Sequence, residues 1–221
     1  MYVQQQVSVF DLLQEAEKEV RRIRYEDALP FLMEVHYARR VPCITHAFGL
    51  FVNGVLSGVC TYGVPASHNL CEGLAGVENA SHVLELNRLA ILPGMNGDNY
   101  ASFLVGRSLR MLPNGTYVVS YADTAWTHVG YVYQATNWLY TGLTKARTDI
   151  YAEGGHSRHY NVGETRRQPR SAKHRYVYLV GDRKTKRLMR SQLRYAVLDK
   201  YPKGDETRYD PYNPVMTGVM N

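Results

Sequence analysis

The chain has 221 residues and a formal net charge of +6; 45% of its residues are hydrophobic and 21% are charged. This composition is typical of a globular protein with one well-filled core and excludes a disordered chain. No apolar run approaches the roughly 20 residues that cross a bilayer. The first residues, MYVQQQVSVFDLL, lack the basic and then apolar order of a signal peptide. We therefore expect a cytoplasmic protein without a membrane partner.

Cysteine usage and charge narrow the class further. Cys43, Cys60 and Cys71 are odd in number and lack CxxC spacing, which favours free thiols in a reducing compartment and argues against a zinc site. The positive net charge favours a polyanionic partner, although many basic proteins have none. The 18 tyrosines supply side chains that can both stack and hydrogen bond.

The first quarter of the chain reads as two helices followed by a hairpin. Apolar residues recur at helical spacing from Val9 to Val20, and a second helix is expected from Tyr25 to about Tyr37. Two strands, Ile44 to Leu50 and Val55 to Val64, come next. Asn53-Gly54 lies between them and is a strong signal for a hairpin turn.

The central stretch reads as a strand, a turn and a helix. After a polar loop from Pro65 to Ala80, a strand is expected from Val83 to Ile91. Pro93 to Asp98 breaks it, and Asp98 or Asn99 can cap the helix that follows. Regular alternation would place five side chains on one side of the strand: Val83, Glu85, Asn87, Leu89 and Ile91.

A strand, a glycine-bearing loop and a capped helix can together form an anion site, because free backbone N–H groups and the positive helix end face one spot. An ordinary strand-to-helix connection is the alternative interpretation. The loop is neither a Walker loop nor a GxGxxG motif, so both nucleotide fingerprints are excluded.

The remaining elements complete an α/β pattern. Thr116 to Tyr121 is a short strand, with Asp123 just past its end. A helix is expected within His128 to Tyr140, stopped by Gly142, and Tyr176 to Val180 is a further strand. This order predicts a single α/β domain over the whole chain, with a central mixed β-sheet and helices on both faces.

Basic residues concentrate near the C-terminus. Nearly half of the 26 lysines and arginines lie between about residues 158 and 194, opposed there only by Glu164 and Asp182. The last residues, about 202–221, are rich in Pro, Asp, Tyr and Asn and suggest an extended tail.

The succession of strand, turn, helix, short strand and helix ending in Leu139-Tyr140 resembles the core of the GNAT acyltransferases. In that fold the pyrophosphate of coenzyme A lies on the loop and the helix start, here near Gly94 to Ser102. The resemblance implies acetyl-CoA as cofactor, with nine candidate binding residues: Leu89, Ala90, Ile91, Gly97, Asn99, Ala101, Ser102, Asn137 and Tyr140.

Several segments resemble the phage Mom family of DNA-modification proteins more closely. They are Glu85-Leu86-Asn87-Arg88-Leu89, Ala101-Ser102-Phe103-Leu104, Gly106-Arg107-Ser108-Leu109, Tyr121-Ala122-Asp123, the run from His128 to Trp138, and His36-Tyr37 followed by Arg39-Arg40. The resemblance spans roughly residues 30 to 145. It implies a GNAT-like enzyme, in the cytoplasm of an infected bacterial cell, that converts adenine in phage DNA to N6-carbamoylmethyladenine. That product shields the DNA from host restriction; acetyl-CoA is the implied donor, and iron is an implied cofactor.

The Mom resemblance places five candidate catalytic residues in its motifs: Asp123, Tyr133, His36, Tyr37 and Tyr121. Asp123 also lies at the carboxyl end of a strand, where open sheets commonly place ligands, so it and Tyr133 can line one cleft. Asp123 could accept a proton from the adenine amino group while a tyrosine returns one. Alternatively, Asp123 and Tyr133 could hold iron through oxygen, with a nitrogen from His36. A capping aspartate and packing tyrosines are the plain structural interpretation.

Double-stranded DNA is the expected partner, and its candidate contacts are basic residues: Arg39, Arg40, Arg166, Arg167, Arg170, Lys173 and Arg175. Such side chains can neutralise phosphates, although a run of charge is often only a solvated face. Adenine N6 is base-paired inside a duplex, so an enzyme acting on it would flip the base out.

Three functions therefore stay open at this point. The first is Mom-like adenine modification. The second is a GNAT-fold, acetyl-CoA-dependent N-acyltransferase acting on another amine, and the third is a non-catalytic DNA-binding protein. A homodimer is compatible with each of them.

Overall fold

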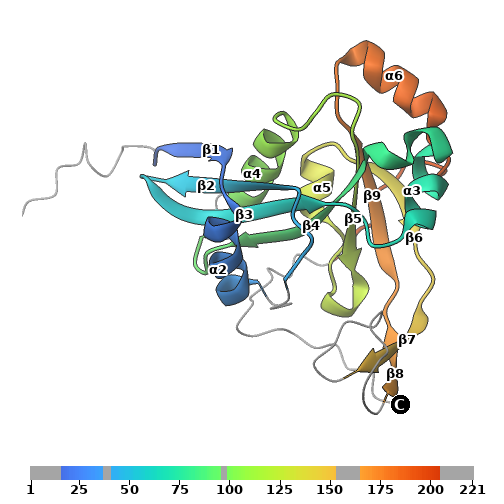
Figure 1. Cartoon of the computed structure of the whole chain (residues 1–221), viewed down its shortest axis with the longest axis horizontal. Coiled ribbons are helices and arrows are strands. Elements are labelled where there is room, and N and C mark those ends of the chain that lie inside the picture. The colour runs from blue at the N-terminus through green and yellow to red at the C-terminus, as the bar shows by residue number, and fades with distance from the viewer. Residues whose placement is uncertain (1–15, 37–40, 96–98, 153–164, 205–221) are drawn as a thin grey trace, which may run out of the picture.

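The computed structural model describes residues 16–36, 41–95, 99–152 and 165–204. Its main sheet has seven strands in the order β1-β2-β3-β4-β5-β9-β6, and β7 and β8 form a separate pair (Figure 1). The strands are β1 (Lys18–Arg22), β2 (His46–Val52), β3 (Val55–Gly63), β4 (Val83–Ile91), β5 (Tyr117–Asp123), β6 (Leu139–Leu143), β7 (Arg147–Ala152), β8 (Thr165–Arg170) and β9 (Lys173–Leu179). The helices are α2 (Tyr25–Val35), α3 (His68–Ala75), α4 (Tyr100–Leu109), α5 (Tyr131–Ala135) and α6 (Arg183–Gln192), with short 3-10 turns η1 (Val77–His82) and η2 (Thr124–Trp126).

Helices cover both faces of the main sheet, which confirms the predicted α/β class. On one side, which we call the α4 face, Leu104 and Leu109 of α4 pack with Phe48 of β2 and Val118 of β5. On the other side, the α2 face, α2 covers β2 and β3, while α3 and α6 cover β5 and β9. Within the described part of the chain, no helix is long and apolar enough to span a membrane.

The predicted helix over Val9 to Val20 is wrong for the part that the structure describes. Lys18–Arg22 is the edge strand β1, and it pairs antiparallel with β2 so that Val20 lies opposite Leu50. A single half-buried apolar residue in five fits a strand as well as a helix, and backbone pairing with β2 decides between them. Residues 9–15 of that prediction lie outside the described residues.

The hairpin and the second helix are confirmed. β2 and β3 are joined by Asn53 and Gly54 with φ values of 50° and 79°, the left-handed pair that a type I′ turn requires. The polar loop predicted over Pro65 to Ala80 is wrong, because it contains α3 and η1. Cys71, Leu74 and Ala75 of α3 are buried at helical spacing on the α2 face, a pattern too short to stand out in the sequence.

Two irregularities of β4 shape the centre of the sheet. β4 and β5 are parallel neighbours over three residue pairs only, from Val83↔Tyr117 to Glu85↔Val119, although both strands continue further. Against β3, the register skips from Thr61↔Arg88 to Tyr62↔Leu86, so Asn87 is the extra residue of a β-bulge. The predicted alternation is therefore wrong beyond Asn87, since the bulge reverses which face later side chains take.

The helix expected within His128 to Tyr140 is shorter than predicted. α5 ends at Ala135, and Asn137 has a left-handed φ of 60°, which breaks the helix before Trp138. Leu139-Tyr140 belongs to strand β6, so Gly142 does not stop the helix as predicted. The strand expected at Tyr176 to Val180 is β9, which lies between β5 and β6 in the sheet.

Candidate active site

A groove of about 480 Å³ lies between α4 and α5 on the α4 face. It brings together three of the predicted cofactor residues, Asn99, Ser102 and Asn137. Asn99 is the N-cap of α4 with a left-handed φ of 58°, and Ser102 Oγ donates to its carbonyl oxygen at 2.9 Å. The helix therefore begins at the groove, where an anion site would need it, and the anion site itself stays a prediction.

The sequence interpretation missed the rest of the groove lining. Those residues are Phe103, Gly106, Arg107, Leu109, Arg110, Ala135, Thr136 and Tyr178. Gly106 is the signal that could have found them, because a glycine within a helix is costly unless something approaches closely. A Cβ at Gly106 would lie 3.7 Å from Thr136 Cγ2, so α5 is in contact range.

The other predicted cofactor residues do not lie together in the structure. Leu89 and Ile91 lie on the α4 face, and Ala101 packs against the core there. Ala90 lies on the opposite face, in the cluster beneath α2. Tyr140 is buried, and its hydroxyl lies 2.8 Å from His174 Nδ1. Gly97 is outside the described residues.

Hydroxyl groups mark the point where β4 and β5 separate. Ser120 follows the last residue of the parallel ladder, and its Oγ donates across the gap to the carbonyl oxygen of Leu86 at 2.8 Å. The Tyr133 hydroxyl lies 2.8 Å from the same Oγ. The Tyr133 ring packs on Trp138 and Tyr176, with centroids 5.1 Å from each. Tyr133 is thus held with its hydroxyl at the opening between the strands.

A second set of uncharged polar groups lies nearby on the same face. The Tyr62 hydroxyl is 2.6 Å from Ser108 Oγ, and Cys60 Sγ donates to the same oxygen at 3.4 Å. Burial raises the pKa of Cys60 to about 12 and raises that of Tyr62 as well. The polar groups beneath α4 are therefore neutral at physiological pH.

Asp123 is engaged with the segment that enters β9. Its carboxylate accepts hydrogen bonds from Ser171 Oγ, Lys173 Nζ and the Ala125 amide, and the Lys173 contact is also an ion pair. Burial by itself would raise the pKa of Asp123, but the hydrogen bonds from Lys173 and Ser171 outweigh it, so the pKa is lowered. The structure bears out the alternative, structural interpretation of Asp123 as a cap, since Asp123 precedes η2 and accepts from the Ala125 amide at 3.0 Å.

The expectation that Asp123 and Tyr133 line one cleft is not met. β5 pairs with β9 without irregularity, so side chains three positions apart point to opposite faces. Ser120 and its Tyr133 partner are on the α4 face, while Asp123 and Tyr121 are on the α2 face. An Asp123–Tyr133–His36 set therefore does not fit one shared iron ion. Within the described ranges, no group of three or more His, Cys, Asp or Glu side chains is placed to hold a metal.

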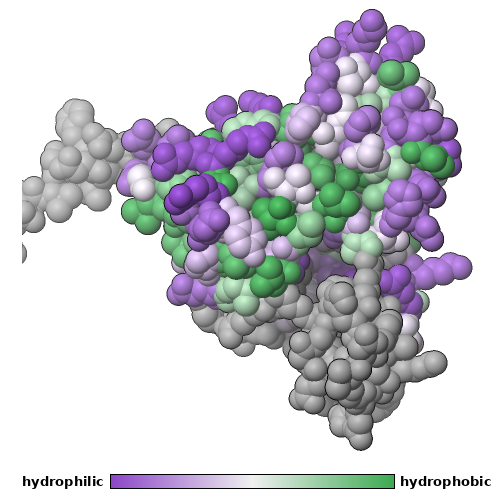
Figure 2. Space-filling view, in the orientation of Figure 1, coloured by the Kyte–Doolittle hydropathy of each residue, from purple (hydrophilic) through white to green (hydrophobic). Residues whose placement is uncertain are grey.

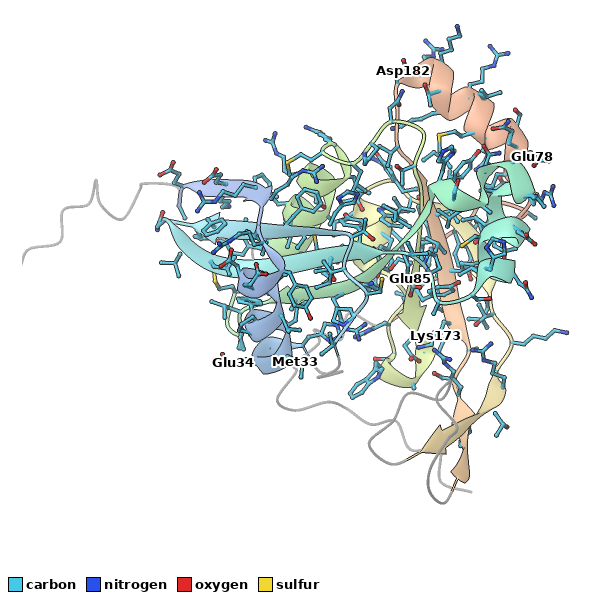
Figure 3. The ribbon with its side chains drawn as sticks, in the orientation of Figure 1. Met33, Glu34, Glu78, Glu85, Lys173 and Asp182 are labelled. Atoms are coloured by element: carbon cyan, nitrogen blue, oxygen red, sulfur yellow. The ribbon has the colours of Figure 1, made fainter. Side chains whose placement is uncertain are left out.

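The α2 face carries the charged groups. Burial and the neighbouring charge of Glu85 raise the pKa of Tyr121. The positive charge of Arg175 opposes this shift but does not reverse it. Arg175 donates to Thr141 Oγ1 at 2.9 Å and lies 3.5 Å above the Tyr195 ring. Figure 3 labels Glu85 and Lys173 along this central region. His36 is also buried, and burial together with the charge of Arg88 lowers its pKa to about 4.

The β4 bulge fixes one wall of this face. Asn87 Oδ1 accepts from Thr61 Oγ1 at 2.7 Å, and Asn87 Nδ2 donates to the carbonyl oxygen of Cys43 at 2.7 Å. Gly63 permits this close approach, because a Cβ there would lie 1.9 Å from the Cys43 oxygen. Arg88 lies opposite Thr61 and so also points to the α2 face.

The predicted DNA contacts are only partly available. Lys173 and Arg175 are half-buried and bonded within the fold to Asp123 and Thr141. Arg170 is exposed at the end of β8. Arg166 and Arg167 lie on β8 with side chains outside the described residues; Arg39, Arg40 and Tyr37 lie wholly outside them.

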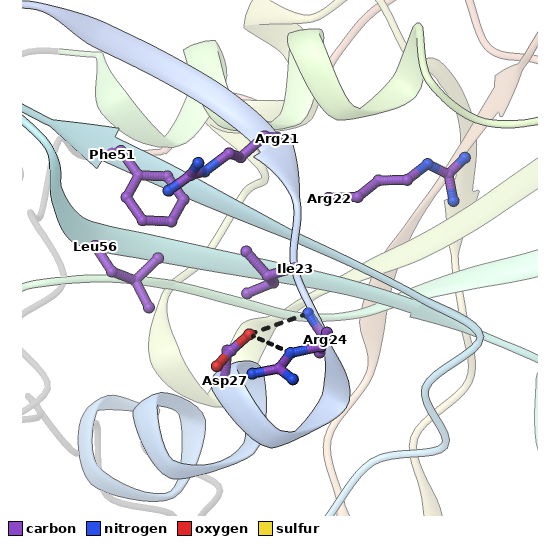
Figure 4. A pocket seen from close by; sticks show the side chains of 7 residues that line it. All are labelled: Arg21, Arg22, Ile23, Arg24, Asp27, Phe51 and Leu56. Atoms are coloured by element: carbon purple, nitrogen blue, oxygen red, sulfur yellow. Dashed lines mark hydrogen bonds and ion pairs between the residues drawn. The ribbon is translucent and has the colours of Figure 1, made fainter.

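A second hollow, of about 450 Å³, lies where β1 leads into α2 (Figure 4). Its arginines are engaged in local contacts. Arg24 pairs with Asp27 at 3.3 Å, Arg21 lies 4.0 Å above the Phe51 ring, and Arg22 donates to the Met111 carbonyl oxygen at 2.6 Å. These contacts account for the lining structurally, and we assign no cofactor to this hollow.

The structure contains the succession on which the GNAT resemblance rests: strand β4, a loop, helix α4, strand β5 and helix α5. The chain belongs to the Mom protein family, whose sequence model matches residues 17–203. No curated protein matches the chain.

Several solved structures that are similar to this chain are acetyltransferases. An N-acetyltransferase from Staphylococcus aureus Mu50 has 13% identity and a TM-score of 0.46, with 74% of this chain and 99% of that chain covered. A putative acetyltransferase from Salmonella typhimurium, solved with its cofactor acetyl-CoA, has 10% identity and a TM-score of 0.46, with 75% and 95% covered. The ribosomal-protein-S18-alanine N-acetyltransferase from Escherichia coli has 9% identity and a TM-score of 0.45, with 75% and 96% covered.

Proposed function

We propose that this protein binds acetyl-CoA in the groove between α4 and α5 and uses it to modify the N6 amino group of adenine in duplex DNA. The product would be the N6-carbamoylmethyladenine that the Mom resemblance implies. The observation that carries the proposal is the end of the β4–β5 ladder at Glu85↔Val119, beside which the hydroxyl groups of Ser120 and Tyr133 meet on the α4 face. Membership of the Mom family supports DNA as the substrate.

The groove supplies what a phosphorylated cofactor needs. The start of α4 presents N–H groups at Asn99 and Ser102, and Arg107 and Arg110 add positive charge one to two turns further along the lining. Asn137, at the turn after α5, offers an amide that could bond the pantetheine arm. The acetyl group of a cofactor bound in this way would point toward the opening at Ser120.

The α2 face would receive the flipped base. Arg88 and Tyr121 lie on this face, and Asn87 holds the 41–45 segment against it. Tyr133, on the α4 face, has its hydroxyl 2.8 Å from Ser120 Oγ, where it could return a proton to a leaving group. An acetyl transfer alone would leave N6-acetyladenine. The carbamoylmethyl group contains one more nitrogen and an oxidised methyl carbon, so this product also requires a nitrogen donor and a two-electron oxidant, to which we assign no residue.

Nucleoside analysis tests the proposal directly. Plasmid DNA from cells that produce the protein is digested, and deoxyadenosine is examined by mass spectrometry for the carbamoylmethyl mass shift. Gly106→Leu should abolish the product and weaken acetyl-CoA binding in calorimetry at least about tenfold, because the new side chain fills the groove. Gly106→Ala is the matched control, since its Cβ meets Thr136 only at ordinary contact distance.

Each result decides between the functions left open by the sequence. An N6-acetyl product would indicate plain acyl transfer to DNA, and acetylation of protein or a small amine with unmodified DNA would favour a GNAT enzyme on another substrate. DNA binding without any acetyl-CoA binding would favour the non-catalytic protein and overturn the proposal.

A further inference from the structure

Helix α6 is a basic helix without acidic residues. Arg183, Lys184, Lys186, Arg187 and Arg190 lie within Arg183–Gln192, and no Asp or Glu does. Arg183, Arg187 and Arg190, which we call the α6 arginine row, are spaced i, i+4 and i+7 and are all exposed. Figure 2 shows hydrophilic side chains over the end of the molecule where Figure 1 draws α6.

This arrangement is unfavourable for an isolated protein. Like charges at i, i+4 destabilise a helix by about 0.2–0.5 kcal/mol per pair, and a solubilising helix normally interleaves acids with bases. Arg183 and Lys184 also stand at the helix N-terminus, where the macrodipole disfavours cations. Asp182 compensates in part as the N-cap, accepting from the Thr185 amide at 2.7 Å. The row is therefore best explained by a negatively charged partner.

The helix is firmly seated on the α2 face. Met189 is buried in the cluster with Leu74 and Leu179, and the Tyr117 hydroxyl donates to the Met189 carbonyl oxygen at 3.4 Å. Just past the helix, the Arg194 amide donates to the Leu74 carbonyl oxygen at 2.9 Å. A ligand held by the arginine row would therefore be positioned relative to the sheet.

The row also lies on the side of the sheet where the proposed substrate would enter. The chain leaves α6 and reaches Tyr195, whose ring covers Arg175 beside Tyr121. Figure 3 labels Asp182 at the start of α6 and Lys173 near the β7–β8 pair, at opposite ends of this face. An elongated polyanion lying across the α2 face could reach α6 and the Tyr121 region together.

We propose that the α6 arginine row is the docking surface for the phosphate backbone of duplex DNA, which places sequence-independent affinity on α6 and not on Lys173 and Arg175. This inference rests on the proposed function, because duplex DNA is the occupant only if DNA is the substrate. Guanidinium groups suit phosphates through bidentate hydrogen bonds. The α6 row thus fixes the duplex while the central face acts on one base.

The test compares two triple variants with equal net charge in DNA binding as a function of salt. Arg183→Gln/Arg187→Gln/Arg190→Gln removes the row and keeps good helix formers. Lys18→Gln/Arg21→Gln/Lys145→Gln is the control, built from exposed cations outside α6. The row variant should bind duplex DNA at least about tenfold more weakly in 0.1 M salt, with a log–log salt slope lower by about 3, and the control should change little.

Other outcomes separate the two proposals. If both variants lose the same amount of DNA affinity, the effect is one of net charge only and the docking surface is overturned. A row variant that binds duplex DNA as tightly as wild type does would also overturn it. If the row variant loses binding to single-stranded RNA but not to duplex DNA, the occupant is wrong. If wild-type protein binds acetyl-CoA but no DNA, the proposed function itself fails. Acetyl-CoA binding should be the same in all three proteins, which also verifies their folding.

Discussion

The two faces of the sheet differ in the kind of polarity they bury. Beneath α4 the polar groups are hydroxyls and a thiol, which burial keeps protonated, as at Tyr62 and Cys60. The α2 face instead carries ion pairs and guanidinium groups, as at Asp123 and Arg175. The uncharged groups buried beneath α4 suit a thioester, and the charged groups of the α2 face suit a nucleic acid. This division matches the two reactants that the proposed function needs.

Tyr133→Phe should have the largest effect of the changes that test this division. The variant removes the hydroxyl that meets Ser120 and leaves the ring packed on Trp138. We expect adenine modification to fall by about 10²-fold or more while acetyl-CoA affinity is retained, because proton transfer is lost and binding is not. The measurement is single-turnover modification of a duplex, followed by mass spectrometry.

Tyr62→Phe is the matched control, since it removes a hydroxyl on the same face that contacts Ser108 and not Ser120. It should retain most of the activity. If Tyr133→Phe is as active as wild type, the proposal that the Tyr133 hydroxyl on the α4 face takes part in the reaction is wrong.

The buried imidazole of His36 gives the α2 face a pH dependence. The pKa of His36 is about 4 in the folded chain, and a histidine in an unfolded chain titrates near 6.5. The unfolded state therefore binds more protons between these values, so stability is full above about pH 6.5 and is lost as pH falls toward 4. We expect a loss of up to about 3 kcal/mol in the free energy of unfolding over this window.

Urea unfolding at a series of pH values measures this loss. His36→Gln should be less stable at pH 7 and should lose less stability than wild type between pH 6.5 and 4.5. Some loss should remain, because burial also lowers the pKa of His46, His128 and His174. If both proteins lose stability in parallel across this window, another group is responsible and His36 is not held neutral.

Local signals in the sequence predicted much of the fold, and long-range pairing accounts for what they missed. Asn53-Gly54 requires its turn whatever surrounds it, and helix α4 follows the predicted N-cap position at Asn99, although the Asn99 side chain makes no capping hydrogen bond. By contrast, the bulge at Asn87 exists only because β3 pairs with both Arg88 and Leu86. Ser120 and Asp123 take opposite faces of β5, and this separates Asp123 from Tyr133 in the predicted catalytic set. The bulge likewise reverses the faces of the later β4 side chains. No spacing within the sequence reports such a division.

A smaller effect is expected at Asp123, where the α2 face holds its half-buried ion pair. Asp123→Asn leaves Lys173 unpaired with 24% of its side chain exposed, which should cost about 2 kcal/mol at pH 7. The pKa of Asp123 is lowered in the folded chain, so this contribution is present above the unfolded value of about 3.9 and is lost as pH falls through the folded one.

The free energies of unfolding of wild type and Asp123→Asn should therefore converge below about pH 4. Glu19→Gln is the control, because its pair with Arg21 is 4.0 Å long and exposed, and such pairs contribute at most about 0.5–1 kcal/mol. If Asp123→Asn is as stable as wild type at pH 7, the ion pair with Lys173 does not stabilise the α2 face.

The smallest expected effect has the opposite sign and concerns the α4 face. Gly106 lies inside α4 without a left-handed φ, so alanine fits its backbone, and the added Cβ would lie 3.7 Å from Thr136. Gly106→Ala should raise the free energy of unfolding by about 0.5–1 kcal/mol, because glycine loses more backbone entropy in a helix. If the variant is instead destabilised, α5 lies closer to α4 than ordinary contact. The groove would then be narrower than a cofactor arm requires, and the α4 face would lose its proposed ligand.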